Sequence, residues 1–150
     1  MDGVTIRPAR PDESDAIAEI ARASREHFLP YLPRLHSLEG DKRFYRTRVF
    51  AECAVWVAEA GGAPIGFCAF RTDWLEHLYL LPGHTGRSVG SALIENAKAR
   101  QDRLQLWVFR ANTGAIRFYA RHGFAVIRET DGAGNEEKTP DVLMEWRRRA

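Results

Sequence analysis

One segment near the middle of the chain constrains the fold more than any other. It reads LYLLPGHTGRSVGSA from Leu78 to Ala92, so a short apolar run ends at Pro82 and a loop with three glycines follows. From Val89 the apolar residues recur at helical spacing up to about Arg100. A strand that leads through a glycine-rich loop into a helix is typical of α/β domains and of phosphate binding, because the free N–H groups and the dipole of the first helical turn attract an anion.

The expected phosphate donors are the backbone N–H groups of Gly86, Arg87, Ser88, Val89 and Gly90, with the hydroxyls of Ser88 and Ser91 as further donors and Arg87 as added charge. The alternative is a plain strand-to-helix connection, which also favours glycine. The loop has neither the Lys-Ser/Thr ending of a P-loop nor the GxGxxG spacing, so both common nucleotide fingerprints are disfavoured.

The remaining pattern predicts one α/β domain over residues 1–150. Alternating apolar runs predict strands at 4–7, 54–59, 64–71, 75–81, 104–109, 124–129 and 141–146, and helical spacing predicts helices at about 14–24, 41–50, 89–100 and 112–122. Asn112 or Thr113 is the expected cap of the last helix, and Gly123 is its expected stop. This order predicts a mixed sheet with helices on both faces.

Composition excludes several classes of protein. Hydrophobic residues make up 45% of the chain, and the net charge of +2 gives no strong nucleic-acid signal. We expect a cytoplasmic protein without a membrane segment, because no apolar run is long enough to span a bilayer and no signal-peptide pattern is present. Cys53 and Cys68 have no metal-ligand spacing, so we expect two buried thiols, no disulfide and no metal.

A second motif lies one strand downstream of the glycine-rich loop. It reads NTGAIRFYARHGF, from Asn112 to Phe124. Together the two segments resemble the GNAT (Gcn5-related N-acetyltransferase) superfamily, whose motifs are a strand, a proline and R/Q-x-x-G-x-G/A, followed by N-x-x-A-x-x-F-Y-x-x-x-G-F. The opening TIRPARPDE and the hairpin VWVAEAGGAPIGF are similar as well, so the resemblance covers nearly the whole chain. Segments LPxLH and NEExxPD indicate a bacterial-type subgroup.

The chain departs from the family pattern inside the loop. Gly83 stands in place of the usual Arg or Gln, and Ser88 in place of the second Gly. Since the phosphate contacts are made by the backbone, a serine is compatible with them if its φ is helical. The missing Arg is expected to weaken one phosphate contact, which affects cofactor affinity and not the fold.

The resemblance implies a mostly antiparallel sheet of six to seven strands, in which two central parallel strands are splayed to hold acetyl-CoA. Here these would be 75–81 and 104–109. It places the pantetheine and acetyl end at the Leu80 backbone, the pyrophosphate on the loop from Gly86 to Gly90, and Asn112 along the pantetheine arm.

The same resemblance implies the chemistry, which is acetyl transfer to a primary amine by direct attack in a ternary complex. Tyr119 matches the family's general-acid tyrosine, and a phenol stays protonated at neutral pH; a core aromatic is the alternative. Glu76 is the candidate base, because strand alternation puts it on the face of Leu78 and Leu80, with His77 and Tyr79 opposite. A structural or substrate-anchoring carboxylate is the alternative for Glu76, and His77 is a weaker candidate base.

Two variable segments are expected to shape the acceptor pocket. LPYLPRLHS supplies His36, and GNEEKTPD supplies Glu136 and Glu137, which would bind a cationic small-molecule amine. A solvated polar loop explains the two glutamates as well. Two other functions stay open: a non-catalytic CoA-binding or sensor module, and an acetyltransferase acting on a protein or RNA-associated acceptor. Family members are often dimers, and the residues do not decide whether this chain forms a homodimer.

Overall fold

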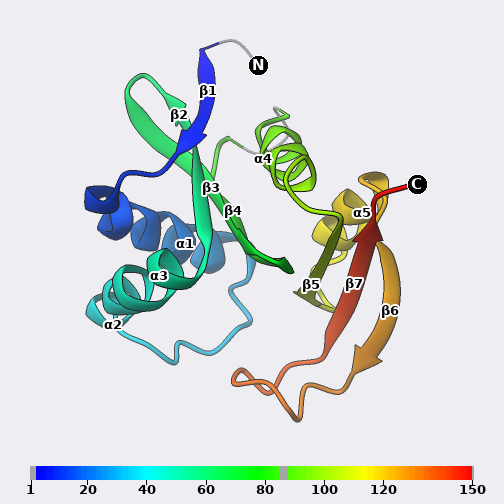
Figure 1. The fold of residues 1–150 in the computed structure, drawn as a ribbon. Helices are drawn as coiled ribbons and strands as arrows, with labels where there is room; N and C mark the ends of the chain where they lie inside the picture. Colours follow the sequence, from blue (N-terminus) through cyan, green and yellow to red (C-terminus); the bar gives the residue numbers. More distant parts are fainter. Residues whose placement is uncertain (1–2, 85–87, 150) are drawn as a thin grey trace.

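The computed structural model describes residues 3–84 and 88–149 (Figure 1). The strands are β1 (Val4–Pro8), β2 (Ala54–Ala60), β3 (Ala63–Arg71), β4 (Asp73–Leu80), β5 (Arg103–Phe109), β6 (Ala125–Thr130) and β7 (Asp141–Arg147). The α-helices are α1 (Ser14–Phe28), α2 (Leu38–Phe44), α3 (Phe50–Glu52), α4 (Val89–Lys98) and α5 (Thr113–Arg121). A 3₁₀ turn at Pro11–Glu13 precedes α1, and a π-helical turn at Tyr45–Val49 joins α2 to α3.

The strands form one seven-stranded sheet in the order β1-β2-β3-β4-β5-β7-β6. All neighbouring strands are antiparallel except β4 and β5, which run parallel. These two pair only at Asp73–Leu104 and Trp74–Gln105, so the hydrogen-bonded ladder ends there and the rest of both strands is free to part. The mixed, mostly antiparallel sheet with a splayed parallel pair is confirmed.

Each face of the sheet carries its own core, because successive strand residues point to opposite faces. Phe67 packs with Ile17, Ile20 and other residues beneath α1, whereas its neighbour Cys68 packs with Leu93 and other residues beneath α4. Figure 1 shows α1, α2 and α3 on one side of the sheet and α4 with α5 on the other. The prediction of helices on both faces is therefore confirmed.

Helix boundaries differ from the sequence-based expectation in two places. The first helix continues past Ser24 to Phe28, and Leu29 N–H still donates to the carbonyl of Arg25, because no helix breaker comes before Pro30. The second helical segment begins at Leu38 rather than about Asp41, since the Ser37 hydroxyl accepts a hydrogen bond from Gly40 N–H at 3.0 Å.

The ends of α5 follow the prediction. Asn112 caps the helix through its side-chain oxygen, which accepts a hydrogen bond from Ala115 N–H at 3.3 Å. Gly123 has a φ of +90°, a left-handed conformation that ends the helix and favours glycine. These two signals fix the position of the helix that carries Tyr119.

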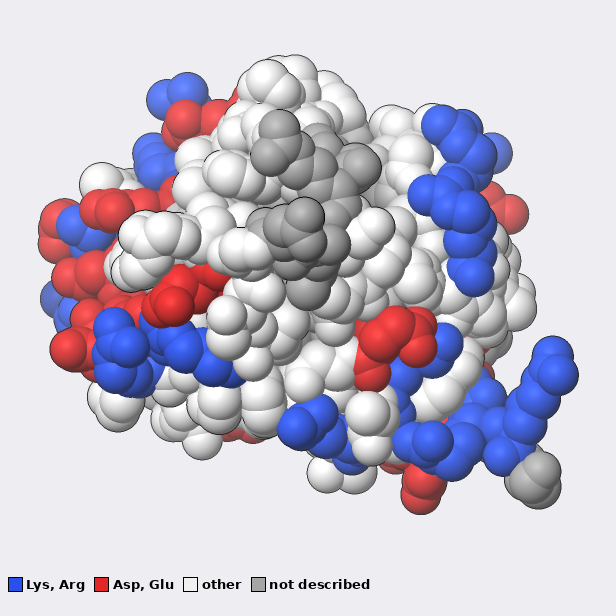
Figure 2. Space-filling view, turned by 90° about the horizontal axis from the view of Figure 1, so that it is seen from above, with Lys and Arg blue, Asp and Glu red and all other residues white. Residues whose placement is uncertain are grey.

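Charged side chains are unevenly spread over the surface. On the face shown in Figure 2, acidic and basic groups are mixed along one side, basic groups gather in a band at the other side, and the middle is largely uncharged. Among residues 3–84 and 88–149, no helix is both long and apolar enough to cross a membrane.

Candidate active site

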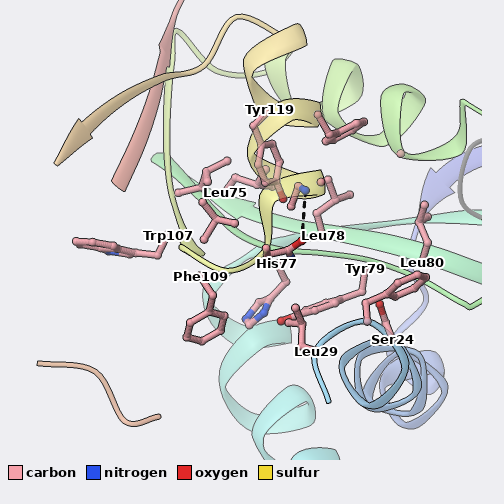
Figure 3. Close-up of a pocket in the computed structure, with 18 of the residues that line it drawn as sticks. Ser24, Leu29, Leu75, His77, Leu78, Tyr79, Leu80, Trp107, Phe109 and Tyr119 are labelled. Carbon is pink, nitrogen blue, oxygen red and sulfur yellow. Dashed lines mark hydrogen bonds between the residues drawn. The ribbon is translucent and has the colours of Figure 1, made fainter. Parts of the chain in front are cut away.

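A cavity of about 640 Å³ lies where β4 and β5 part. Residues 75–80 of β4 and 106–109 of β5 line it, together with the start of α4 and one face of α5. Figure 3 shows Tyr119 on one side of β4 and His77, Tyr79 and Leu29 on the other. The cavity thus passes through the gap between the two strands and opens toward both helical layers.

The β4 strand contains a bulge that changes which side chains share a face. Ala69 of β3 pairs with His77, but Phe70 pairs with Leu75, so Glu76 is the extra residue. Leu75 therefore joins Leu78 and Leu80 in the core beneath α4, at the place on their face that simple alternation gave to Glu76. Glu76 is exposed, lines the cavity, and lies 3.7 Å from the Arg71 guanidinium.

The start of α4 forms the far end of this cavity. Ser88, Gly90 and Ser91 line it, and the first N–H groups of the helix have no partner within the helix. The predicted donors Gly86 and Arg87 lie outside the described residues. The condition of a helical φ at Ser88 is not met, because its φ is +65°, in the left-handed region that favours glycine.

Gly90 shows why the family pattern requires a small residue in the first turn of this helix. A Cβ on Gly90 would lie 3.3 Å from Cζ of Phe118, so α4 and α5 could not approach as closely. Counting R/Q-x-x-G-x-G/A back from Gly90 puts Ser88 at the other glycine position and Thr85 at the Arg/Gln position. This count is an alternative to the one that makes Gly83 the substituted residue.

Tyr119 and Asn112 both line the cavity from α5. Burial raises the pKa of Tyr119 above its ordinary value, so its hydroxyl carries a proton at neutral pH. Its ring packs against Phe118 and Phe124, with centroids 5.3 and 5.6 Å away, which limits its movement. The Asn112 side-chain oxygen is used in capping α5, and its amide nitrogen is the group left to face a ligand.

A second cavity of about 460 Å³ lies between α1, the 29–37 segment, α2 and the loop before β7. All three predicted acceptor residues line it: His36, Glu136 and Glu137. His36 Nε2 contacts the Glu136 carboxylate, and Glu137 lies 3.2 Å from the Arg25 guanidinium. Segments about a hundred residues apart in sequence are thereby joined around one opening.

The two cavities lie side by side, because three residues line both of them: Leu29, His77 and Tyr79. Burial, and secondarily the charge of Arg25, lowers the pKa of His77 to about 4, so its ring is neutral at neutral pH. The hydroxyl of Tyr45 lies 3.4 Å from His77 Nδ1. Burial raises the pKa of Tyr79, although Arg25 acts against this shift.

Sequence reasoning missed Arg25 and Tyr79 as residues of this junction. Arg25 lies near the end of α1 and contacts a carboxylate from the far end of the chain, a pairing that no local motif encodes. Tyr79 was assigned to the face opposite Leu78 and Leu80, which is confirmed, but its place between two cavities depends on the partners around it.

Both cysteines are free, with Cys53 half-buried and Cys68 buried. Burial raises the pKa of Cys53 to about 11 and that of Cys68 to about 12, so both are protonated thiols at neutral pH. Across residues 3–84 and 88–149, no group of three or more His, Cys, Asp or Glu side chains is arranged to hold a metal ion.

Known proteins resemble this chain both in sequence and in fold. The acetyltransferase (GNAT) domain family matches residues 51–126. The chain is 28% identical to the peptidyl-lysine N-acetyltransferase YiaC of Escherichia coli, covering 94% of this chain and 95% of that protein. It is 33% identical to the N-acetyltransferase MJ1207 of Methanocaldococcus jannaschii, covering 80% of this chain but only 60% of that longer protein.

Two solved structures have the same fold over almost their whole length. Apo-YjaB from Escherichia coli has a TM-score of 0.78 at 22% identity, covering 97% of this chain and 99% of that one. The PaiA N-acetyltransferase of Thermoplasma acidophilum, solved in complex with coenzyme A, has a TM-score of 0.74 at 24% identity, covering 96% and 98%. The chain therefore belongs to the GNAT acetyltransferase family, whose acetyl donor is acetyl-CoA.

Proposed function

We propose that this chain transfers the acetyl group of acetyl-CoA directly to a primary amine in a ternary complex. The observation that carries the proposal is the meeting of two cavities at Leu29, His77 and Tyr79. One cavity follows the β4–β5 gap to the start of α4, as an elongated donor requires, and the other opens beside it. A donor thioester and an acceptor amine bound in these cavities would meet without an intermediate carrier.

In this proposal the donor lies along β4. The Leu80 backbone meets its pantetheine and acetyl end, the N–H groups and hydroxyls from Ser88 to Ser91 receive the pyrophosphate, and Asn112 borders the pantetheine arm. Gly86 and Arg87, which lie outside the described residues, stay predicted phosphate donors. Free N–H groups at the start of α4 and the helix dipole are suited to a diphosphate.

The proposed chemistry forms one bond and breaks one. The neutral amine attacks the acetyl carbon, so the C–N bond forms and the C–S bond breaks. Tyr119 donates its proton to the departing sulfur, and the proton lost by the new amide nitrogen restores the Tyr119 hydroxyl. Tyr119 supports this role because it lines the donor cavity and burial keeps it protonated. The raised thiol pKa values of Cys53 and Cys68 give no support to an acetyl-cysteine intermediate.

The amine reaches the site as an ammonium ion and must lose a proton. We assign its removal to Glu76 through a water molecule, because Glu76 lines the donor cavity and is exposed to solvent. His77 is closer to the junction but stays the weaker candidate, because its half-buried ring is less open than the exposed Glu76 to the water that would carry the proton away. Replacing Glu76 by Gln should flatten the acidic limb of the pH profile of kcat/KM. An unchanged limb would remove Glu76 from the mechanism.

A small cationic amine is the acceptor class that the second cavity supports best. Four carboxylates and three guanidinium groups line it, namely Glu26, Asp41, Glu136, Glu137, Arg22, Arg25 and Arg34. The Arg22 guanidinium pairs with Asp41 at 3.0 Å and with Glu26 at 3.3 Å. The Arg25 guanidinium pairs with Glu137 at 3.2 Å. Among the described residues, Glu136 pairs with His36 and with no guanidinium group, so it is the carboxylate available to an ammonium ion.

A lysine side chain of a protein is the second candidate acceptor. Exposed apolar side chains border the two cavities: Leu35 and Phe44 are each 44% exposed at the second cavity, and Phe28 is 41% exposed at the donor cavity. Such side chains would pack against the residues that flank a lysine. The names of YiaC and of YjaB from Salmonella typhimurium, both peptidyl-lysine N-acetyltransferases, favour the same acceptor.

The test is thiol release from acetyl-CoA with polyamines, amino sugars, free amino acids and lysine peptides as acceptors. We expect release with one class and its loss in Tyr119→Phe. Thiol release with lysine peptides alone would show that the acceptor is a protein lysine and not a small amine. No release with any of them, despite acetyl-CoA binding, would contradict the proposed acceptor class.

A further inference from the structure

Three polar side chains form a chain of hydrogen bonds at the start of α4. The Ser91 hydroxyl lies 3.0 Å from Nε2 of His122, and Nδ1 of His122 lies 2.9 Å from Oε2 of Glu95. Ser91 and Glu95 are one turn apart on α4, and His122 follows the last turn of α5. The proposed amine chemistry does not use this arrangement.

Several contacts hold His122 in place. Its side chain is 16% exposed, its ring packs against Phe118 with centroids 4.8 Å apart, and Lys98 Nζ donates to its backbone carbonyl at 2.8 Å. In the described part of the chain, the charged groups near His122 are Glu95 and Lys98 of α4 and the preceding Arg121; on the β7 side Gly123 packs against the uncharged Trp146.

The tautomer of His122 follows from the Glu95 contact. A carboxylate only accepts hydrogen bonds, so Nδ1 carries a hydrogen in both protonation states of the ring. In the neutral ring, Nε2 is an acceptor and takes the hydrogen of the Ser91 hydroxyl. In the charged ring, Nε2–H donates to the Ser91 oxygen, and the hydroxyl hydrogen becomes free to point elsewhere.

Only the charged ring of His122 leaves the Ser91 hydroxyl able to donate a hydrogen bond to an anion. Ser91 lines the donor cavity at the helix start, where the proposed function puts the pyrophosphate. A hydroxyl that already gives its hydrogen to His122 would present only lone pairs to a phosphate oxygen, whereas one that accepts from His122 donates to it. We propose that His122 is a positioning residue for the donor: held by Glu95, and in its protonated form, it turns the Ser91 hydroxyl toward the diphosphate of CoA.

This inference rests on the proposed function and adds a proton linkage to it. Donor binding should take up a proton and weaken as His122 loses its charge at higher pH. The loss of one hydrogen bond to a charged group predicts about tenfold weaker binding when the ring is neutral than when it is charged, and a pH range from about 6 to about 8.5 is used to compare the two.

The test is the dissociation constant of 3′-dephospho-CoA by calorimetry across this range. This probe keeps the diphosphate but lacks the 3′-phosphate, whose own ionisation near pH 6 would obscure the effect. We expect wild-type affinity to fall with pH. In Ser91→Ala and in His122→Gln, whose amide donates to Ser91 at every pH, the affinity should be independent of pH. His27→Gln, an exposed histidine of α1, is the matched control and should keep the wild-type slope.

Pantetheine, which has no phosphate, separates the two claims. Its binding should be independent of pH in every variant. An unchanged slope in Ser91→Ala or His122→Gln, both folded by circular dichroism, would overturn the role of His122 while leaving acetyl transfer intact. If the wild type binds neither CoA nor pantetheine, the proposed function and this inference both fail.

Discussion

The two cavities of this protein are built in different ways. The donor cavity is formed mainly by neighbouring elements in chain order, which are β4, the start of α4, β5 and α5, with Ser24, Phe28 and Leu29 at one side. The acceptor cavity is formed by side chains from α1, the 29–37 segment, α2 and the 131–140 loop, and its segments are joined by the His36–Glu136 and Arg25–Glu137 contacts. The first cavity depends mainly on backbone geometry, and the second mainly on side-chain identity.

Under the proposed function, this difference separates the part of the molecule that carries out the reaction from the part that selects the acceptor. Backbone geometry is preserved when surface side chains change, so one donor cavity can serve many family members. Changes at a few side chains, such as Arg25 or His36, can alter the acceptor without disturbing the donor. Mutations in the two cavities should accordingly change different kinetic constants.

The largest expected effect is on the donor side. Replacing Tyr119 by Phe keeps the ring packing on Phe118 and Phe124 but removes the proton donor. We expect kcat to fall by about 100-fold or more with little change in the KM of either substrate. Steady-state thiol release measures both constants. Full turnover in this variant at saturating substrates would show that Tyr119 is only a packing residue.

The junction of the cavities should make stability depend on pH. Burial lowers the pKa of His77 from its ordinary 6.5 to about 4, so the neutral ring favours the folded state above pH 6.5 and this contribution is lost as the pH falls toward 4. The free energy of unfolding should fall by about 1.4 kcal/mol per pH unit, which is about 2 kcal/mol between pH 6.5 and pH 5.

Urea unfolding at several pH values measures this loss. His77→Gln should reduce the loss of stability on acidification by that amount, whereas the exposed His27→Gln should not. Equal slopes in His77→Gln and the wild type would show that His77 titrates normally and that the junction is open to water.

The acceptor cavity should respond through KM alone. Arg25→Ala leaves Glu137 without its guanidinium partner and removes the ion pair that holds α1 to the loop before β7 at this cavity. We expect the acceptor KM to rise about tenfold, with the acetyl-CoA KM unchanged. Arg48→Ala is the matched control, because it removes an exposed guanidinium that pairs with Glu52 outside both cavities. A rise in the acetyl-CoA KM instead would mean that the cavities are not separate in function.

The smallest expected effect concerns Ser88. Its left-handed backbone is strained for any residue with a Cβ, so replacing it by glycine relieves strain in the folded state. Glycine also gives the unfolded chain more conformational freedom, which destabilises the folded state and offsets most of this gain. Ser88→Gly should raise the free energy of unfolding by about 0.5 kcal/mol, and Ser88→Val should lower it by about 1 kcal/mol. Thermal unfolding distinguishes the pair. Stabilisation by Val would show that Ser88 is not left-handed in solution.

The sequence predicted the donor side well because its signals are local. Asn112 and Gly123 mark the ends of α5, and the strand–loop–helix pattern marks the start of α4, so these elements could be located without tertiary information. The family motifs then connected them to acetyl-CoA. The bulge at Glu76 was missed because it depends on the register against β3, which strand alternation alone does not reveal.

The acceptor side was predicted only in part. His36, Glu136 and Glu137 were placed around one pocket, and all three line the second cavity. Their partners were not foreseen, since the Arg25–Glu137 pair joins residues 112 positions apart and exists only after the sheet has formed. Whether the glutamates bind the acceptor stays a prediction.

The central claim is that donor and acceptor occupy joined cavities at the same time. Initial velocities of thiol release, measured with acetyl-CoA varied at several fixed concentrations of the active amine, test it most directly. Direct transfer predicts double-reciprocal lines that intersect. Parallel lines, together with an acetylated enzyme formed from acetyl-CoA alone, would show transfer through a covalent intermediate and contradict the claim.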